Sequence, residues 1–273
     1  MGHQGFRKKR AKTSLPLPRT NFTLNGCYAA QLQDCSRSFD REHFVSKSLL
    51  KEIERKGGLR VTGFPWQAKD TTDWIPPQAI AASVLCKRHN QALSPLDAIA
   101  ARLFRAMDES VLVPSPQLYL FCGHEIERWL LKLLCGAGFS GNFTAPTKSQ
   151  PIPIEWLRIL FGRDDFPDQT GLYTPTRTND FAPLATGIGY GPILHKAFGV
   201  VGLQVLLCSY QLSLLMQPVP DRTIAGVPVA WRPMELHTTG PNYEKSLMFS
   251  WDGPADLGSL EIAIGVPPAP NAG

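Results

Sequence analysis

Three cysteines and one histidine in the first third of the chain place the strongest constraint on its fold. Cys86 and His89 are three residues apart at the start of an expected helix, so both side chains project from one face and can bind one ion. Cys27 and Cys35 lie in a segment rich in turn residues and could supply two more ligands. Their separation is longer than the two to four residues usual between paired zinc ligands. We expect a structural zinc ion bound by all four residues, with Cys27 as an ordinary core cysteine as the alternative.

A second group of polar residues lies in the same segment. Glu42 and His43 are adjacent near an expected strand end, where one side chain can hold a metal ion while the other reaches a substrate. Asn90 follows His89 by about 100° around the helix axis and so points away from the zinc pair. Carboxylate and amide oxygens suit Mg²⁺ or Mn²⁺, and a histidine beside such an ion can remove a proton from water. Asp97, on the same helical face as Asn90, is a lesser candidate ligand; the favoured alternative is that it contacts a partner at the helix surface or faces water.

Together these residues resemble the motif of the HNH endonucleases, in the branch with Asn in the last motif position, as in phage endonucleases that resolve Holliday junctions. The resemblance covers about 80 of the 273 residues and is carried by Cys27, Cys35, Glu42-His43 and Leu85-Cys86-x-x-His89-Asn90. It implies a ββα-metal finger built on a treble-clef zinc knuckle, with His89 in place of the usual fourth cysteine. It also implies that Glu42 and Asn90 bind a catalytic Mg²⁺ or Mn²⁺ ion. His43 would then activate a water molecule to attack a phosphodiester.

The chain departs from that family between His43 and Cys86. The family's middle Asn, which orients the histidine, has no counterpart at residues 79–84, and the long interval requires an insertion. This departure leaves a second hypothesis, a zinc-stabilised nucleic-acid-binding module without catalysis. A third hypothesis is a protein–protein adaptor in which the cysteines are core residues.

The positive charge of the chain is concentrated at its start. The chain has 28 Lys and Arg against 23 Asp and Glu, a formal net charge of +5, and six of the basic residues but no acidic residue lie in residues 1–20. We expect a flexible arm there, whose basic side chains contact nucleic-acid phosphates, DNA being the expected partner. The residues concerned are Arg7, Lys8, Lys9, Arg10 and Lys12. A solubilising tail is the alternative.

The sequence also bears on the compartment. No apolar run follows the basic start, so a secretory signal is not expected. Six cysteines without such a signal favour a reducing, cytoplasmic location over a disulfide framework. Residues 197–220 are uncharged, but polar residues and prolines interrupt them, so we expect buried strands, with a transmembrane helix as the minor alternative, and no membrane partner.

The periodicity of apolar residues predicts an α+β protein. Helices are expected over Lys47–Lys56, Pro95–Glu109 and His124–Cys135, and residues 57–80 are expected to be a long connection. Beyond Gly136 the chain is rich in Pro, Gly and short apolar runs, which favours strands. We therefore expect an arm over residues 1–20, an HNH-like domain over 21–110, and a helix-led, β-rich domain over 111–273 that selects the substrate or a protein partner.

Overall fold

The computed structural model describes residues 15–108, 116–143, 151–176, 187–208, 210–219, 221–240, 243–256 and 259–263. These ranges contain both helices and strands, so the prediction of an α+β fold is confirmed. The basic residues of the predicted arm lie outside the described residues: Arg7, Lys8, Lys9, Arg10 and Lys12.

The first half of the chain is built from two antiparallel strand pairs and two helices. In chain order its elements are η1 (Ala30–Leu32), β1 (Phe39–Glu42), α1 (Lys47–Ile53), β2 (Leu59–Thr62), β3 (Thr72–Ile75), η2 (Pro77–Ile80), β4 (Ala82–Cys86) and α2 (Lys87–Met107). Strand β1 pairs with β4, and β2 pairs with β3. Helix α2 begins directly after β4, so β1, β4 and α2 form a ββα unit.

Helix α2 is longer than the sequence predicts. The helix expected from Pro95 and the helical start expected at Cys86–His89 belong to one helix of 21 residues. Pro95 has no backbone N–H and leaves the carbonyl oxygen of Gln91 without its usual donor. The hydroxyl of Ser94 donates to that oxygen at 2.9 Å, so the helix continues through the proline.

The prediction of a plain connection over residues 57–80 is wrong. Strands β2 and β3 form an antiparallel hairpin there, and Leu59 and Val61 point inward while Arg60 and Thr62 point to solvent. This alternation spans only four residues, too few to stand out beside the surrounding glycines, prolines and tryptophans.

The second half is rich in strands, as the sequence predicts. It begins with β5 (Gln117–Cys122), α3 (Gly123–Phe139) and α4 (Ile154–Leu160), and continues with β6 (Gly171–Pro175), β7 (Ile188–His195), β8 (Gly199–Leu207), β9 (Tyr210–Leu215), β10 (Thr223–Ile224), β11 (Val227–Trp231), β12 (Glu235–Gly240), β13 (Tyr243–Ser250) and β14 (Ser259–Ala263). Helix α3 contains the predicted helix, whereas α4 was not predicted. Pro153 occupies the N-cap position of α4, within the proline-rich region where strands were expected.

The strands of the second half form two sheets. One has six strands in the order β10-β11-β6-β9-β8-β7, and the other has four in the order β14-β12-β13-β5. Strands β8 and β9 come from the uncharged stretch of residues 197–220, and their register joins Gly202 to Leu215. Buried strands were predicted for this stretch and are confirmed. Among the described residues, no helix has the length and apolar character needed to cross a bilayer.

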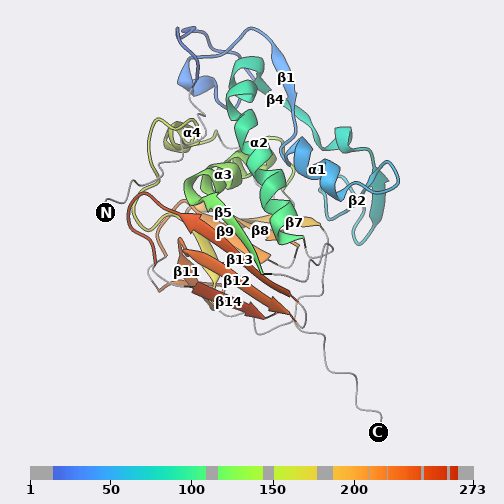
Figure 1. Cartoon of the computed structure of the whole chain (residues 1–273). Helices are drawn as coiled ribbons and strands as arrows, with labels where there is room; N and C mark the ends of the chain where they lie inside the picture. Colours follow the sequence, from blue (N-terminus) through green and yellow to red (C-terminus); the bar gives the residue numbers. More distant parts are fainter. Residues whose placement is uncertain are drawn as a thin grey trace.

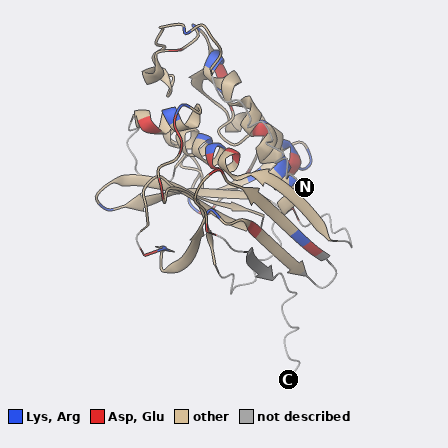
Figure 2. Ribbon diagram, turned by 60° about the vertical axis from the view of Figure 1, so that its left-hand side comes forward, with Lys and Arg blue, Asp and Glu red and all other residues tan. Residues whose placement is uncertain are grey.

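Helix α3 connects the two halves. Figure 1 shows it between the ββα unit and the two sheets, with α2 crossing it. Its buried residues lie on all its faces, and a single hydrophobic core runs from Cys27 to Phe249 through both halves. The ribbon in Figure 2 carries more segments coloured for charged residues in the helical part than on the strands of the sheets.

A buried ion pair fastens α3 to the sheets. The guanidinium of Arg232 donates to both carboxylate oxygens of Glu127, at 2.8 and 3.1 Å, and the backbone N–H of Leu172 donates to the same carboxylate at 2.9 Å. A Cβ atom at Gly171 would lie 2.0 Å from Glu127 Oε1, so only glycine lets the carboxylate approach β6. The pair joins α3 to β6 and to the end of β11.

We expect Arg232→Met to lower the free energy of unfolding by about 3–5 kcal/mol, because it leaves the buried Glu127 carboxylate without its cation. The control is Arg105→Met, which removes the exposed pair between Arg105 and Glu52 and should cost less than about 1 kcal/mol. Urea denaturation of both variants measures the difference. Equal losses in the two variants would contradict the structural role of the buried pair.

Candidate metal centre

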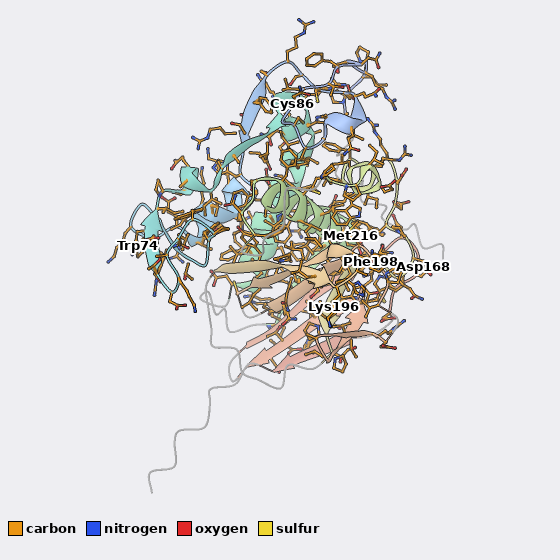
Figure 3. The ribbon with its side chains drawn as sticks, turned by 180° about the vertical axis from the view of Figure 1, so that it is seen from behind. Trp74, Cys86, Asp168, Lys196, Phe198 and Met216 are labelled. Atoms are coloured by element: carbon orange, nitrogen blue, oxygen red, sulfur yellow. The ribbon has the colours of Figure 1, made fainter. Side chains whose placement is uncertain are left out.

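The structure brings the four predicted zinc ligands together. Cys27 and Cys35 come from the loops on either side of η1, Cys86 ends β4, and His89 lies in the first turn of α2. All four side chains are buried, and their ligand atoms lie within 4.8 Å of one another. Figure 3 shows Cys86 at the end of the molecule farthest from the two sheets.

The spacing of these atoms suits a tetrahedral metal ion. His89 Nδ1 lies 3.5 Å from the sulfur of Cys27, 3.7 Å from that of Cys35 and 3.1 Å from that of Cys86. Zinc–sulfur and zinc–nitrogen bonds of about 2.3 and 2.0 Å at a tetrahedral angle separate sulfur and nitrogen by about 3.5 Å. The Cys₃His cluster could therefore hold a metal ion such as zinc.

Local structure holds the η1 loops against α2. Cys35 N–H donates to the carbonyl of Phe22 at 2.8 Å, and Tyr28 N–H donates to that of Val84 on β4 at 2.9 Å. The buried carboxylate of Asp34 pairs with Arg88 of α2, with Nε and Oδ1 3.1 Å apart. The loops are thus fixed at the cluster by contacts on both sides.

Hydrogen bonds inside the cluster favour a thiolate at Cys86. The side chain of Cys27 and then that of His89 lower the pKa of the Cys86 thiol, against the effect of burial. The pKa of Cys27 is raised, first by its hydrogen bond with Cys86 and then by burial. A bound metal ion would hold all three sulfurs as thiolates, so metal binding releases protons.

The two predicted ligands of the catalytic ion have different partners in the structure. Asn90 Nδ2 donates to Asp40 Oδ2 on β1 at 3.1 Å, at the surface of the protein. A bulge between Asp40 and Glu42 shifts the register of β1 against β4, so Asp40 is exposed while Glu42 is only 3% exposed. The bulge turns the Glu42 side chain inward, toward Lys132 rather than toward Asn90.

Glu42 and Asp97 share one ammonium group. Lys132 Nζ of α3 lies 2.8 Å from Glu42 Oε1 and 2.5 Å from Asp97 Oδ1. Burial raises the pKa of Glu42 to about 7, against the opposing effect of Lys132. Burial also disfavours the charge on Lys132, but Glu42 and Asp97 outweigh it and raise the Lys132 pKa. Asp97 therefore lies beside Glu42 in a cation-binding pair of carboxylates, and its side chain is 27% exposed.

His43 is half-buried beside this pair, and its Nε2 is buried without a hydrogen-bond partner in the described part of the chain. Burial, followed by the charge of Lys47, lowers the pKa of His43, while Asp97 raises it. The neutral imidazole is therefore favoured. A neutral ring with an unpartnered nitrogen is the form that can accept a proton from water.

Two residues of this region were missed by reasoning from the sequence. Asp40 lies two residues before Glu42 and could have been included as a second carboxylate on the same strand. Lys132 is a lysine among the inward apolar residues of the helix predicted at His124–Cys135, a position where an unpaired charge is not tolerated. The position of Lys132 therefore indicated a buried acidic partner, but the sequence did not indicate which carboxylates provide it.

The chain matches no protein-family model, no curated protein and no solved structure. The chemistry available to the site therefore follows from its own residues: a Cys₃His cluster that could hold a metal ion such as zinc, and separate contacts of Asp40 with Asn90 and of Glu42 and Asp97 with Lys132.

We expect the purified protein to contain about one zinc ion per chain, because the ligand set is that of a structural zinc site. Cys86→Ser should lose most of the metal, and a chelator should lower the melting temperature of the wild type. Cys122→Ser, at a half-buried cysteine outside the cluster, is the control and should keep its zinc. Elemental analysis measures the content. A wild type without metal, or a metal content unchanged in Cys86→Ser, would refute the site.

Proposed function

We propose that this protein is a metal-dependent endonuclease of the HNH type that hydrolyses phosphodiester bonds in DNA. The observation that carries the proposal is the ββα unit formed by β1, β4 and α2, with the Cys₃His cluster at its base and Asn90 directly after the last cluster residue. In this arrangement the zinc fixes the start of α2 against β4. It thereby sets the position of Asn90 relative to the carboxylates of β1.

The oxygen-bearing side chains of β1 and the start of α2 are of the types that a hard divalent cation binds, and binding through Glu42 would require it to leave Lys132. Asp40, Glu42 and Asn90 offer two carboxylates and one amide within one strand and one helical turn. The amide of Asn90 donates to Asp40 in the metal-free arrangement, and rotation of the amide about its last bond would present the oxygen instead. Mg²⁺ or Mn²⁺ prefers these ligands and would neutralise charge on a bound phosphate.

His43 is assigned to proton transfer. Its unpartnered Nε2 and its lowered pKa keep it neutral and able to take a proton from the attacking water. The pair formed by Asp97 and Lys132 lies beside it. Asp97 raises the pKa of His43, so we assign it the role of stabilising the imidazolium that proton transfer creates.

We expect the purified protein to nick or cleave plasmid DNA when Mg²⁺ or Mn²⁺ is added. His43→Ala should lower the rate by at least about 100-fold, because general-base catalysis contributes about 10²–10⁴-fold. Gel electrophoresis of the products measures the rates, and zinc content shows that each variant retains the fold. If His43→Ala and the wild type act alike on DNA and on RNA, the enzyme function is refuted.

Two carboxylates of β1 compete for the role of metal ligand, and a matched pair of variants separates them. Glu42→Gln should abolish cleavage at any Mn²⁺ concentration, since we assign Glu42 as the principal carboxylate ligand. Cleavage by Asp40→Asn should be restored by excess Mn²⁺, since we assign the exposed Asp40 only an assisting role in binding the ion. The reverse pattern would move the ion to the surface pair of Asp40 and Asn90.

The second candidate function is a zinc-stabilised nucleic-acid-binding module without catalysis. It is favoured by the ion pair between Glu42 and Lys132, because this pair occupies the carboxylate that the catalytic ion requires. Zinc-dependent DNA binding that is unaffected by Glu42→Gln and His43→Ala, without cleavage by the wild type, would establish it.

A further inference from the structure

The β2–β3 hairpin lies in the interval where the chain departs from the HNH motif, and it presents two large aromatic rings to solvent. Trp74 is 58% exposed and Trp66 is 54% exposed. Trp66 stacks on Phe64, with ring centroids 5.3 Å apart and planes 22° apart. Figure 3 shows Trp74 at the outer edge of the molecule, on the side away from Phe198 and Lys196 of the sheet.

Trp74 lies between two hollows. A cavity of about 500 Å³ lies between the hairpin, α1 and β7, and a more open one of about 350 Å³ lies beside the turn that precedes β2; Trp74 lines both. A Cβ atom at Gly58 would lie 3.4 Å from the Trp74 ring, in ordinary van der Waals contact, so the ring lies close to the turn that precedes β2. Both volumes are within the range of about 300–1,000 Å³ typical of ligand sites.

The hollows are lined by apolar groups and cations. Arg55 and Arg60 line the larger hollow and Lys56 the smaller, and none of the described residues that line either is acidic. Arg60 is directly opposite Trp74 in the hairpin register, so the two side chains project from the same face. In the larger hollow, the buried hydroxyl of Tyr190 has no hydrogen-bond partner in the described part of the chain.

We propose that this hairpin binds an unpaired nucleic-acid strand, with bases stacked against Trp74 in the two hollows and phosphates on Arg55, Lys56 and Arg60. Flat aromatic rings flanked by cations match the two parts of a single strand, its bases and its backbone. The Tyr190 hydroxyl offers a hydrogen bond to the edge of a base in the larger hollow. Base pairing would hold the bases inside a duplex, so the hairpin selects nucleic acid with unpaired positions. The proposal rests on the proposed function, whose substrate it specifies.

The test compares the two exposed tryptophans of one hairpin. Fluorescence anisotropy measures binding of the full, zinc-loaded chain to a labelled single-stranded DNA of about 15 nucleotides, without added divalent metal so that no cleavage occurs. We expect Trp74→Ala to weaken binding by about 5- to 150-fold, the value of stacking one or more bases. Trp66→Ala should change it less than about twofold, and Trp74→Phe should restore most of the affinity. A blunt duplex should bind more weakly and should not respond to Trp74→Ala.

A second variant addresses the phosphate contacts. Arg60→Gln should weaken binding at low salt and reduce the slope of log affinity against log salt by about 0.7, the value for one phosphate contact on a single strand. Equal binding by Trp74→Ala and the wild type, or an equal loss in Trp66→Ala, would overturn the proposal. So would a duplex that binds as tightly as the single strand.

The outcomes separate this inference from the proposed function. If the wild type cleaves no nucleic acid but Trp74 governs single-strand binding, the proposed function fails and the hairpin site stands. If cleavage depends on His43 but Trp74→Ala binds and cleaves single strands like the wild type, the hairpin site fails and the nuclease stands.

Discussion

The Cys₃His cluster is the constraint on which the rest of the candidate site depends. It joins three separate pieces of chain: the loops around η1, the end of β4 and the first turn of α2. The ligand atoms from these pieces all lie within 4.8 Å of one another. A short two-stranded pairing such as β1–β4 is marginal alone, and a metal ion bound by the cluster at one end would give it a fixed geometry. Because Asn90 follows the last cluster residue, its position is set by the same cluster.

The second constraint is the charge at Lys132. This buried ammonium from α3 reaches the carboxylates of Glu42 and Asp97, so the second half of the chain contributes directly to the region around the ββα unit. Removing the lysine or its carboxylate partners would leave a buried charge without an opposite charge. The α3 helix is therefore more than a link between the sheets and the site, because it supplies the cation that balances the site's carboxylates.

The residues of the metal cluster could be predicted from the sequence because cysteine and histidine have few roles at such spacings. Helix α3 could be predicted because its apolar residues recur with the helical period over several turns. The β2–β3 hairpin could not be predicted, since two strands of four residues give little periodicity. The bulge in β1 could not be predicted either, because a register shift depends on pairing with a strand about 40 residues away in the sequence. That single shift separates Asp40 from Glu42 and decides which carboxylate meets Asn90 and which meets Lys132.

Anomalous X-ray scattering from crystals soaked in Mn²⁺, recorded at the zinc and manganese absorption edges, would locate both kinds of metal ion in the protein. We expect a zinc peak among Cys27, Cys35, Cys86 and His89. We also expect a separate manganese peak between β1 and α2, bound by Asn90 and a carboxylate of β1. A cluster without zinc, or manganese bound only at sites remote from β1 and α2, would contradict the metal-dependent mechanism.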